Sequence, residues 1–290
     1  MAPQEQIRGV QYLPDGSIVI ASGSTIYYLE LLPQSSTINQ ISYTIKDTIE
    51  TNQTLVNCFQ YLIDGRIVIG GNDGTIRIYQ YEDEDEKFQL VQILRPESER
   101  KKPVTAIYVP PASDIRNTAP KIYSGHSDGK IIVWVLDTTT NEYKQEKIIE
   151  TSKGEIQFKD IVGLVEIERR IIFANDNGTI GYFDLDETGR PKDFIKIIHQ
   201  EKGNNENEEG GLNPRISDMI VSKDGKYIIV SFVKGENSII KIFENQQGEE
   251  YKEIATLNFD NYIINKLQVD PNGQIYVFTS RGEIIYIGGQ

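Results

Sequence analysis

The segment Asp128–Trp134 reads Asp-Gly-Lys-Ile-Ile-Val-Trp, a tight glycine turn followed by a branched apolar run that ends on a large apolar side chain. Five further segments follow the same pattern: Gly23–Leu29, Asp73–Tyr79, Asn177–Phe183, Asn237–Phe243 and Arg281–Ile287. The second turn residue stands at positions 24, 74, 129, 178, 238 and 282, so successive copies are 50, 55, 49, 60 and 44 residues apart. The 290-residue chain is therefore built from six units of similar length.

Repetition near fifty residues, with strands instead of helices in each unit, is typical of a β-propeller. We expect an all-β, six-bladed propeller of four-stranded antiparallel blades that occupies residues 1–290 as a single domain. The blades are expected at about 7–50, 55–96, 103–151, 160–201, 214–260 and 262–290.

Within a unit, the second and third strands are nearly continuous runs of Ile, Val, Tyr and Phe. In an antiparallel sheet this composition predicts burial on both faces, as for a blade packed between two neighbours. The repeated segments also predict a register. In that register one structurally equivalent, mostly buried position is occupied by Leu29, Tyr79, Trp134, Phe183, Phe243 and Ile287.

Only five outer, fourth strands can be found in the sequence. Three residues follow Ile287, and the segment Met1–Gln6 contains Pro3 and makes a poor strand. We therefore expect a sixth blade that lacks its outer strand. Either a partner or a longer parent chain supplies that strand, or the gap is tolerated and Met1–Gln6 folds over the edge.

Composition limits the classes of partner. The formal net charge of −13 disfavours nucleic acid, and no apolar run is long enough to insert into a membrane. A single cysteine, Cys58, allows no internal disulfide, and no secretory signal is visible at the start. We expect an intracellular, cytoplasmic protein that binds protein or peptide partners as a subunit of a larger assembly.

The third unit carries a more specific pattern and resembles a WD repeat. In that family a serine of the second strand, an aspartate of the turn and a tryptophan of the third strand form a hydrogen-bonded set. Ser124, Asp128 and Trp134 match these places, but no histidine lies in Pro96–Pro103 to complete the set from the preceding loop. The resemblance extends over nearly the whole chain as a pattern and identifies the WD-repeat β-propeller superfamily, without pointing to one protein.

Catalytic and metal-binding motifs are scarce. The two histidines, His126 and His199, belong to different units, and we expect one in an exposed turn and the other on an outer strand with a surface role. No spacing of histidine, cysteine and carboxylate residues indicates zinc, and no phosphate-binding loop is present. The sequence thus predicts no catalytic residue, no metal site and no cofactor.

Binding residues of a propeller are expected in the loops that share one end of the blades, because loops carry recognition on a rigid scaffold. These partner-binding candidates are Asn52, Asn72, Lys102, His126, Asn175, Asp176, Arg215, Lys234, Tyr262 and Arg281. The leading hypothesis is a non-enzymatic, WD-repeat-like interaction scaffold that binds through these loops and through the open edge of the sixth blade.

The alternative hypothesis is a metal-dependent hydrolase of the six-bladed lactonase type, which the segment Asp270–Val277 faintly resembles. That resemblance implies inward-facing carboxylates and amides that bind calcium. No such set can be assembled from equivalent positions of the six units.

Overall fold

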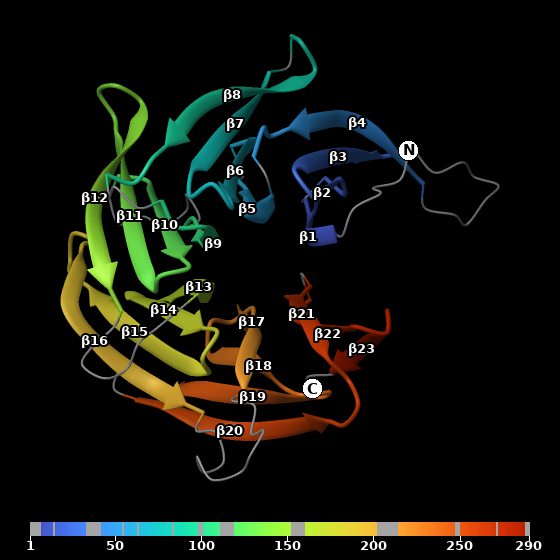
Figure 1. Cartoon of the computed structure of the whole chain (residues 1–290), viewed down its shortest axis with the longest axis vertical. Helices are drawn as coiled ribbons and strands as arrows, with labels where there is room; N and C mark the ends of the chain where they lie inside the picture. The colour runs from blue at the N-terminus through green and yellow to red at the C-terminus, as the bar shows by residue number, and fades with distance from the viewer. Residues whose placement is uncertain are drawn as a thin grey trace. The chain divides into compact units, whose positions relative to one another are not determined.

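The structure is a computed structural model, and it describes residues 7–13, 15–32, 42–53, 55–62, 64–82, 84–97, 101–110, 119–151, 160–201, 214–246, 250–270 and 272–287. These residues form six antiparallel sheets in which strands follow one another in chain order (Figure 1). Five sheets have four strands and the sixth has three, which confirms the predicted six-bladed β-propeller with an incomplete last blade. No helix among the described residues is long and apolar enough to cross a membrane.

The first three blades contain strands β1 to β12. Blade 1 consists of β1 (Ile7–Tyr12), β2 (Ile18–Ser22), β3 (Thr25–Leu31) and β4 (Tyr43–Glu50). Blade 2 consists of β5 (Val56–Tyr61), β6 (Arg66–Gly71), β7 (Ile76–Glu82) and β8 (Lys87–Leu94). Blade 3 consists of β9 (Val104–Tyr108), β10 (Lys121–His126), β11 (Lys130–Asp137) and β12 (Glu142–Glu150).

The last three blades contain strands β13 to β23. Blade 4 consists of β13 (Ile161–Ile167), β14 (Arg170–Asn175), β15 (Thr179–Leu185) and β16 (Pro191–Gln200). Blade 5 consists of β17 (Arg215–Val221), β18 (Tyr227–Lys234), β19 (Asn237–Gln246) and β20 (Glu250–Phe259). Blade 6 consists of β21 (Ile264–Val269), β22 (Ile275–Thr279) and β23 (Ile284–Ile287).

The chain forms two compact units, each with its own core. Unit 1 holds Met1–Ser127 and Ile131–Ile148, and unit 2 holds Asp128–Lys130 and Ile149–Gln290. Apolar clusters lie between blades 1 and 2 and between blades 2 and 3 in unit 1, and between blades 4 and 5 and blades 5 and 6 in unit 2. These cores form where neighbouring sheets pack against each other. This packing confirms the predicted burial of both faces of the sheets. The expectation of one domain over all six blades stays a prediction.

The predicted register is confirmed in every blade. Each large residue at the end of a third strand pairs with an isoleucine of the second strand, as in Ile67 with Tyr79 and Ile171 with Phe183. Tyr79, Trp134, Phe183 and Phe243 are buried, whereas Leu29 and Ile287 are partly exposed.

Polar side chains connect the first strands of neighbouring blades. The amide of Gln11 accepts from the N–H of Tyr61 at 2.8 Å and donates to its carbonyl at 3.1 Å, and Gln60 makes the same pair of bonds with Val109. In unit 2 the buried carboxylate of Asp218 accepts from the N–H of Leu267 at 2.8 Å. These bonds satisfy backbone groups at strand edges that face the next blade.

The expectation for His126 is wrong, because its buried imidazole joins Ser124 and Trp134 in a hydrogen-bonded set. His126 is the last residue of β10 and is 2% exposed instead of lying in an exposed turn. Its Nδ1 donates to the carbonyl of Lys102 at 3.2 Å, and its Nε2 contacts Ser124 Oγ at 3.0 Å, the oxygen that accepts from Trp134 Nε1 at 2.9 Å. The histidine of the set therefore comes from the same blade, two residues beyond the serine.

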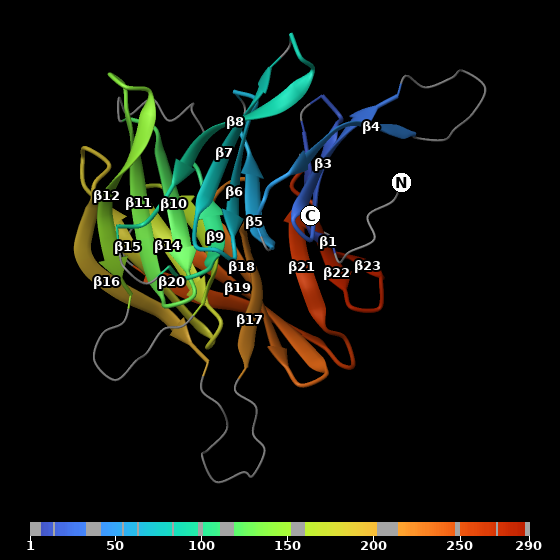
Figure 2. The same cartoon turned by 45° about the horizontal axis from the view of Figure 1, so that its top comes forward.

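Blade 6 ends at β23, whose other edge has no strand beside it among the described residues (Figure 2). On this strand Ile284 is 62% exposed and Tyr286 is 49% exposed. Residues 1–6, considered above as a cover for this edge, lie outside the described residues.

The equivalent core position supplies the first testable prediction. Phe183 is fully buried, so Phe183→Ala is expected to lower the free energy of unfolding by about 3–5 kcal/mol through lost burial and a cavity. Phe194→Ala is the matched control, since Phe194 is 61% exposed and its loss is expected to cost about 0.5 kcal/mol. Urea denaturation followed by fluorescence measures both, and equal losses would contradict the assigned packing.

The hydrogen-bonded set of blade 3 supplies a second prediction. Ser124→Ala removes the partner of both Trp134 Nε1 and His126 Nε2 inside the core, and we expect it to cost about 2–4 kcal/mol. Ser280→Ala, at an exposed turn position, is expected to change stability by less than about 0.5 kcal/mol. Thermal and urea denaturation compare the two variants, and a Ser124→Ala protein as stable as the control would refute the role of the set.

Candidate functional site

The predicted partner-binding residues belong to both compact units, with Asn52, Asn72, Lys102 and His126 in unit 1 and the other six in unit 2. The exposed members are Asn52, Asn72, Lys102, Arg215 and Arg281, and the half-exposed ones are Asp176, Lys234 and Tyr262. The structure brings the guanidinium of Arg281 to 5.0 Å from the centre of the Tyr262 ring, and it brings His126 Nδ1 to 3.2 Å from the carbonyl oxygen of Lys102. His126 and Asn175 are buried and cannot contact a partner directly. Binding by the exposed members stays a prediction.

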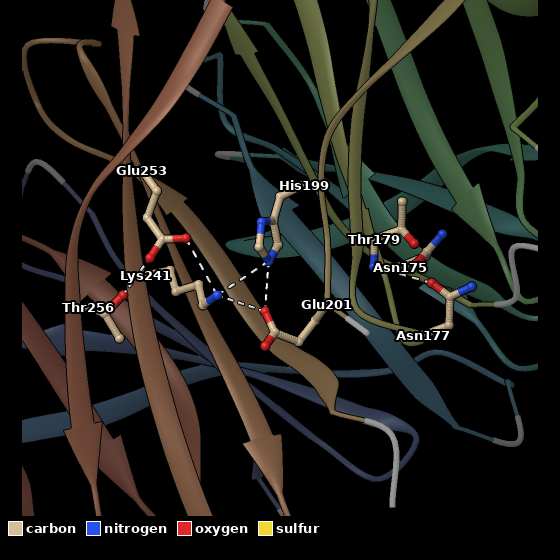
Figure 3. Close-up of polar contacts among 8 residues, drawn as sticks. All are labelled: Asn175, Asn177, Thr179, His199, Glu201, Lys241, Glu253 and Thr256. Carbon is tan, nitrogen blue, oxygen red and sulfur yellow. Dashed lines mark hydrogen bonds and ion pairs between the residues drawn. The ribbon is translucent and has the colours of Figure 1, made fainter. Parts of the chain in front are cut away.

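A group of four ionisable side chains lies between blades 4 and 5, where the sequence predicted no site (Figure 3). His199 Nε2 lies 2.7 Å from Glu201 Oε2, and the same oxygen accepts from Lys241 Nζ at 2.7 Å. Lys241 Nζ also lies 3.4 Å from His199 Nε2 and 3.4 Å from Glu253 Oε2. We refer to His199, Glu201, Lys241 and Glu253 as the His199 cluster.

Regular strand geometry positions the members of this cluster. His199 lies near the end of β16 and Glu201 follows two residues later, so both side chains point to the same side of the strand. Lys241 lies in the middle of β19, opposite Thr256 of β20, and Glu253 lies on β20. The outer strand of one blade therefore faces the outer two strands of the next.

Aromatic rings form one wall of the cluster. The imidazole of His199 is 5.3 Å from the ring centre of Phe243 and 5.7 Å from that of Phe232, and Lys241 Nζ lies 5.8 Å from the centre of Phe232. The side chain of Lys241 is 13% exposed, and those of His199 and Glu201 are 20% and 23% exposed. The polar groups thus lie in a setting from which water is largely, but not wholly, excluded.

The hydrogen bonds define the protonation pattern of the histidine. A carboxylate can only accept, so the bond to Glu201 places a proton on Nε2 of His199. The other ring nitrogen, Nδ1, has no hydrogen-bond partner among the described residues and is not closed off from solvent. In the neutral imidazole, Nδ1 therefore carries the lone pair and can accept a proton.

Opposing effects act on the pKa of Glu201. Partial burial raises it, but the hydrogen bonds and charges of Lys241 and His199 outweigh burial and hold the pKa of this carboxyl below its usual value. Glu201 is therefore an anion at neutral pH. A fixed carboxylate next to an imidazole is the arrangement that orients a histidine and stabilises its protonated form.

A glycine turn fixes the backbone of Glu201. The N–H of Glu201 donates to the carbonyl of Gly178 at 3.1 Å, within the turn that joins β14 to β15. Gly178 has a φ of +84°, and a Cβ there would lie 2.9 Å from the carbonyl oxygen of Pro214. Only glycine combines this conformation with so close an approach. The glycine turn that recurs along this chain therefore also positions Glu201, a member of the His199 cluster.

The same turn holds buried polar atoms of Asn175 and Thr179 that have no hydrogen-bond partner among the described residues. The Nδ2 of Asn175 and the Oγ1 of Thr179 make no hydrogen bond, although both residues are fully buried. Thr179 instead donates its backbone N–H to the side-chain oxygens of Asn175, at 3.1 Å, and Asn177, at 3.2 Å (Figure 3). Asn175 therefore acts in the turn that supports Glu201, and not on the surface.

A metal site of the lactonase type finds no matching residues in the part of the chain that the structure describes. No three His, Cys, Asp or Glu side chains there are arranged so that they could hold a metal ion. The His199 cluster offers one imidazole and two carboxylates, but the ammonium group of Lys241 lies among them. The residues present therefore do not fit a calcium ion at this place.

Sequence reasoning missed the cluster for an identifiable reason. His199 was expected on an outer strand, which is confirmed, but an outer strand of one blade also faces the next blade. The available signal was the spacing His-x-Glu at the end of a strand, together with a lysine in the otherwise apolar third strand of blade 5.

The pKa of Glu201 leads to a prediction about stability. Because the folded-state pKa lies below the usual value, Glu201 stabilises the fold at neutral pH, and this contribution is lost as the pH falls through that folded pKa. The difference in unfolding free energy between the native chain and Glu201→Gln is expected to shrink steadily at acidic pH. Urea titrations from pH 7 downward measure it, and a difference independent of pH would contradict the ionic role of Glu201.

The family comparison matches one segment of the chain. Residues 43–80 match the family described as "WD domain, G-beta repeat". A search among curated proteins gives no match. The matched residues contain the outer strand of blade 1 and the first three strands of blade 2, and they confirm the WD-repeat resemblance at family level.

Solved structures are similar over almost the whole chain. A protein of Bacteroides uniformis assigned as a 6-phosphogluconolactonase has 13% identity and a TM-score of 0.66, covering 96% of this chain and 82% of its own. A protein of Bacteroides fragilis with the same assignment has 12% identity, a TM-score of 0.67 and the same coverage. A periplasmic gluconolactonase of Pseudomonas aeruginosa has 12% identity and a TM-score of 0.68, covering 94% of this chain and 78% of its own.

These likenesses correct two predictions. The non-enzymatic interaction scaffold and the absence of enzymatic activity are wrong as leading interpretations, because the similar structures are lactonases and favour the alternative hypothesis. Cytoplasmic location and a protein partner stay predictions, and one similar protein is periplasmic. At 12–13% identity the likeness shows the fold, so the chain is a six-bladed β-propeller in which residues 43–80 match a WD repeat.

Proposed function

We propose that this chain is a hydrolase that opens the lactone ring of sugar acids. The proposal rests on one observation, the histidine–carboxylate pair of His199 and Glu201 with an open Nδ1, in a fold similar to that of lactonases. Lactone opening needs a base that activates water and an acid that protonates the leaving oxygen, and one histidine can fill both roles.

The reaction can be written with the groups of the His199 cluster. Nδ1 of His199 takes a proton from water while the water oxygen bonds to the lactone carbonyl carbon. The ring C–O bond then breaks, and the departing ring oxygen receives that proton from the imidazolium, which yields the open hydroxy acid. Glu201 accepts the hydrogen bond from the Nε2–H group throughout. Its negative charge stabilises the positive charge that the imidazole ring carries between the two steps.

Lys241 and Glu253 act as positioning residues in this scheme. The ammonium of Lys241 bridges the two carboxylates, which keeps Glu201 ionised and directed toward His199. The ring wall of Phe232 and Phe243 limits water around the pair, so that the attraction between imidazolium and carboxylate is stronger than in bulk solvent. No step is assigned to a metal ion, since the described residues offer no ligand set for one.

Activity on glucono-δ-lactone tests the proposal. Acid release is followed with a pH indicator and corrected for spontaneous opening. We expect His199→Asn to lower kcat/KM by about 100-fold or more, the usual contribution of a general base. Lys192→Ala is the control, because Lys192 is exposed on the same strand, β16, and it is expected to leave the rate unchanged.

Two results would overturn this function. One is a native chain that gives no rate above spontaneous opening with any sugar-acid lactone tested. The other is a His199→Asn variant that is as active as the Lys192→Ala control, with both proteins shown to be folded by circular dichroism.

A further inference from the structure

We infer that this site prefers the lactone of an unphosphorylated sugar acid to that of a phosphorylated one. The inference rests on the proposed function and concerns the substrate class of the same site. It follows from the charges of the side chains that make up the His199 cluster.

The His199 cluster has a net negative charge. Lys241 supplies one positive charge, and Glu201 and Glu253 each supply one negative charge, at 2.7 Å and 3.4 Å from its Nζ. With a neutral imidazole, the four side chains carry a net charge of −1. The side chain of Glu253 is 37% exposed, so one of the two carboxylates is accessible to an approaching ligand.

A phosphate group needs cationic or N–H donors that are free to turn toward it. The ammonium of Lys241 is already shared between two carboxylates, and its side chain is 13% exposed. A phosphate dianion beside the cluster would therefore meet net repulsion.

The net charge of the whole chain also disfavours the binding of a phosphorylated lactone. A formal net charge of −13 lowers the local concentration of anionic ligands and slows their encounter with the site. A neutral lactone meets neither effect. We expect a preference of about tenfold or more in kcat/KM for the unphosphorylated lactone at low ionic strength, decreasing as salt screens the charges.

The test compares glucono-δ-lactone with 6-phosphoglucono-δ-lactone as substrates of the full chain. Glu253→Gln removes one negative charge and is expected to raise kcat/KM for the phosphorylated lactone several-fold, so that the preference narrows. Glu250→Gln is the matched control, since Glu250 is exposed at the start of the same strand, β20, and takes no part in the cluster. It is expected to leave the preference unchanged.

The outcomes separate this inference from the proposed function. A preference for the unphosphorylated lactone that narrows in Glu253→Gln and not in Glu250→Gln supports the inference. An equal or higher kcat/KM for the phosphorylated lactone overturns the inference and leaves lactone hydrolysis standing. Activity on neither lactone overturns the proposed function, and the inference with it.

Discussion

Burial of the large apolar side chain at the end of the third strand in blades 2 to 5, opposite an isoleucine of the neighbouring strand, is the constraint on which the other features depend. It forces the second and third strands to be apolar on both faces and makes adjacent sheets pack against each other. The same residue also builds the candidate site. Phe243 anchors blade 5 from this position, and its ring lies 5.3 Å from the imidazole of His199. Core packing and site geometry are therefore coupled through a single side chain.

Charged groups can persist between two packed blades because each one has a partner. Lys241 interrupts an apolar strand, and burying its ammonium without an anion would be costly. Glu201 and Glu253 approach it from two different blades and offset that cost. The turn at Gly178 determines where Glu201 stands, since its carbonyl accepts the Glu201 N–H. A structural turn, a buried ion pair and an open imidazole nitrogen thus form one connected arrangement.

The repeated segments were sufficient to predict the six blades, the register and the missing outer strand, because strand period and turn chemistry are local properties of the sequence. The His199 cluster was not predictable in the same way. Its members come from positions 199 to 253 and meet only through the packing of one blade on the next. His126 was misplaced because a turn assigned from Asp128-Gly129 begins after it, and strand β10 reaches His126 before the chain reverses. Resemblance to WD repeats predicted the fold correctly, but the similar solved structures do not favour the interaction-scaffold role that was inferred from it.

The central claim is that His199, and not another part of the fold, is the place where the ligand binds. The chain has two histidines, so long-range proton–nitrogen NMR spectra of the imidazoles contain two ring systems, of which the buried His126 serves as an internal reference. Titration with gluconate, the hydroxy acid formed from glucono-δ-lactone, is expected to shift the ring nitrogens of His199 in a saturable manner and to leave those of His126 unchanged. Unchanged signals for His199, or equal shifts of both histidines, would contradict the account.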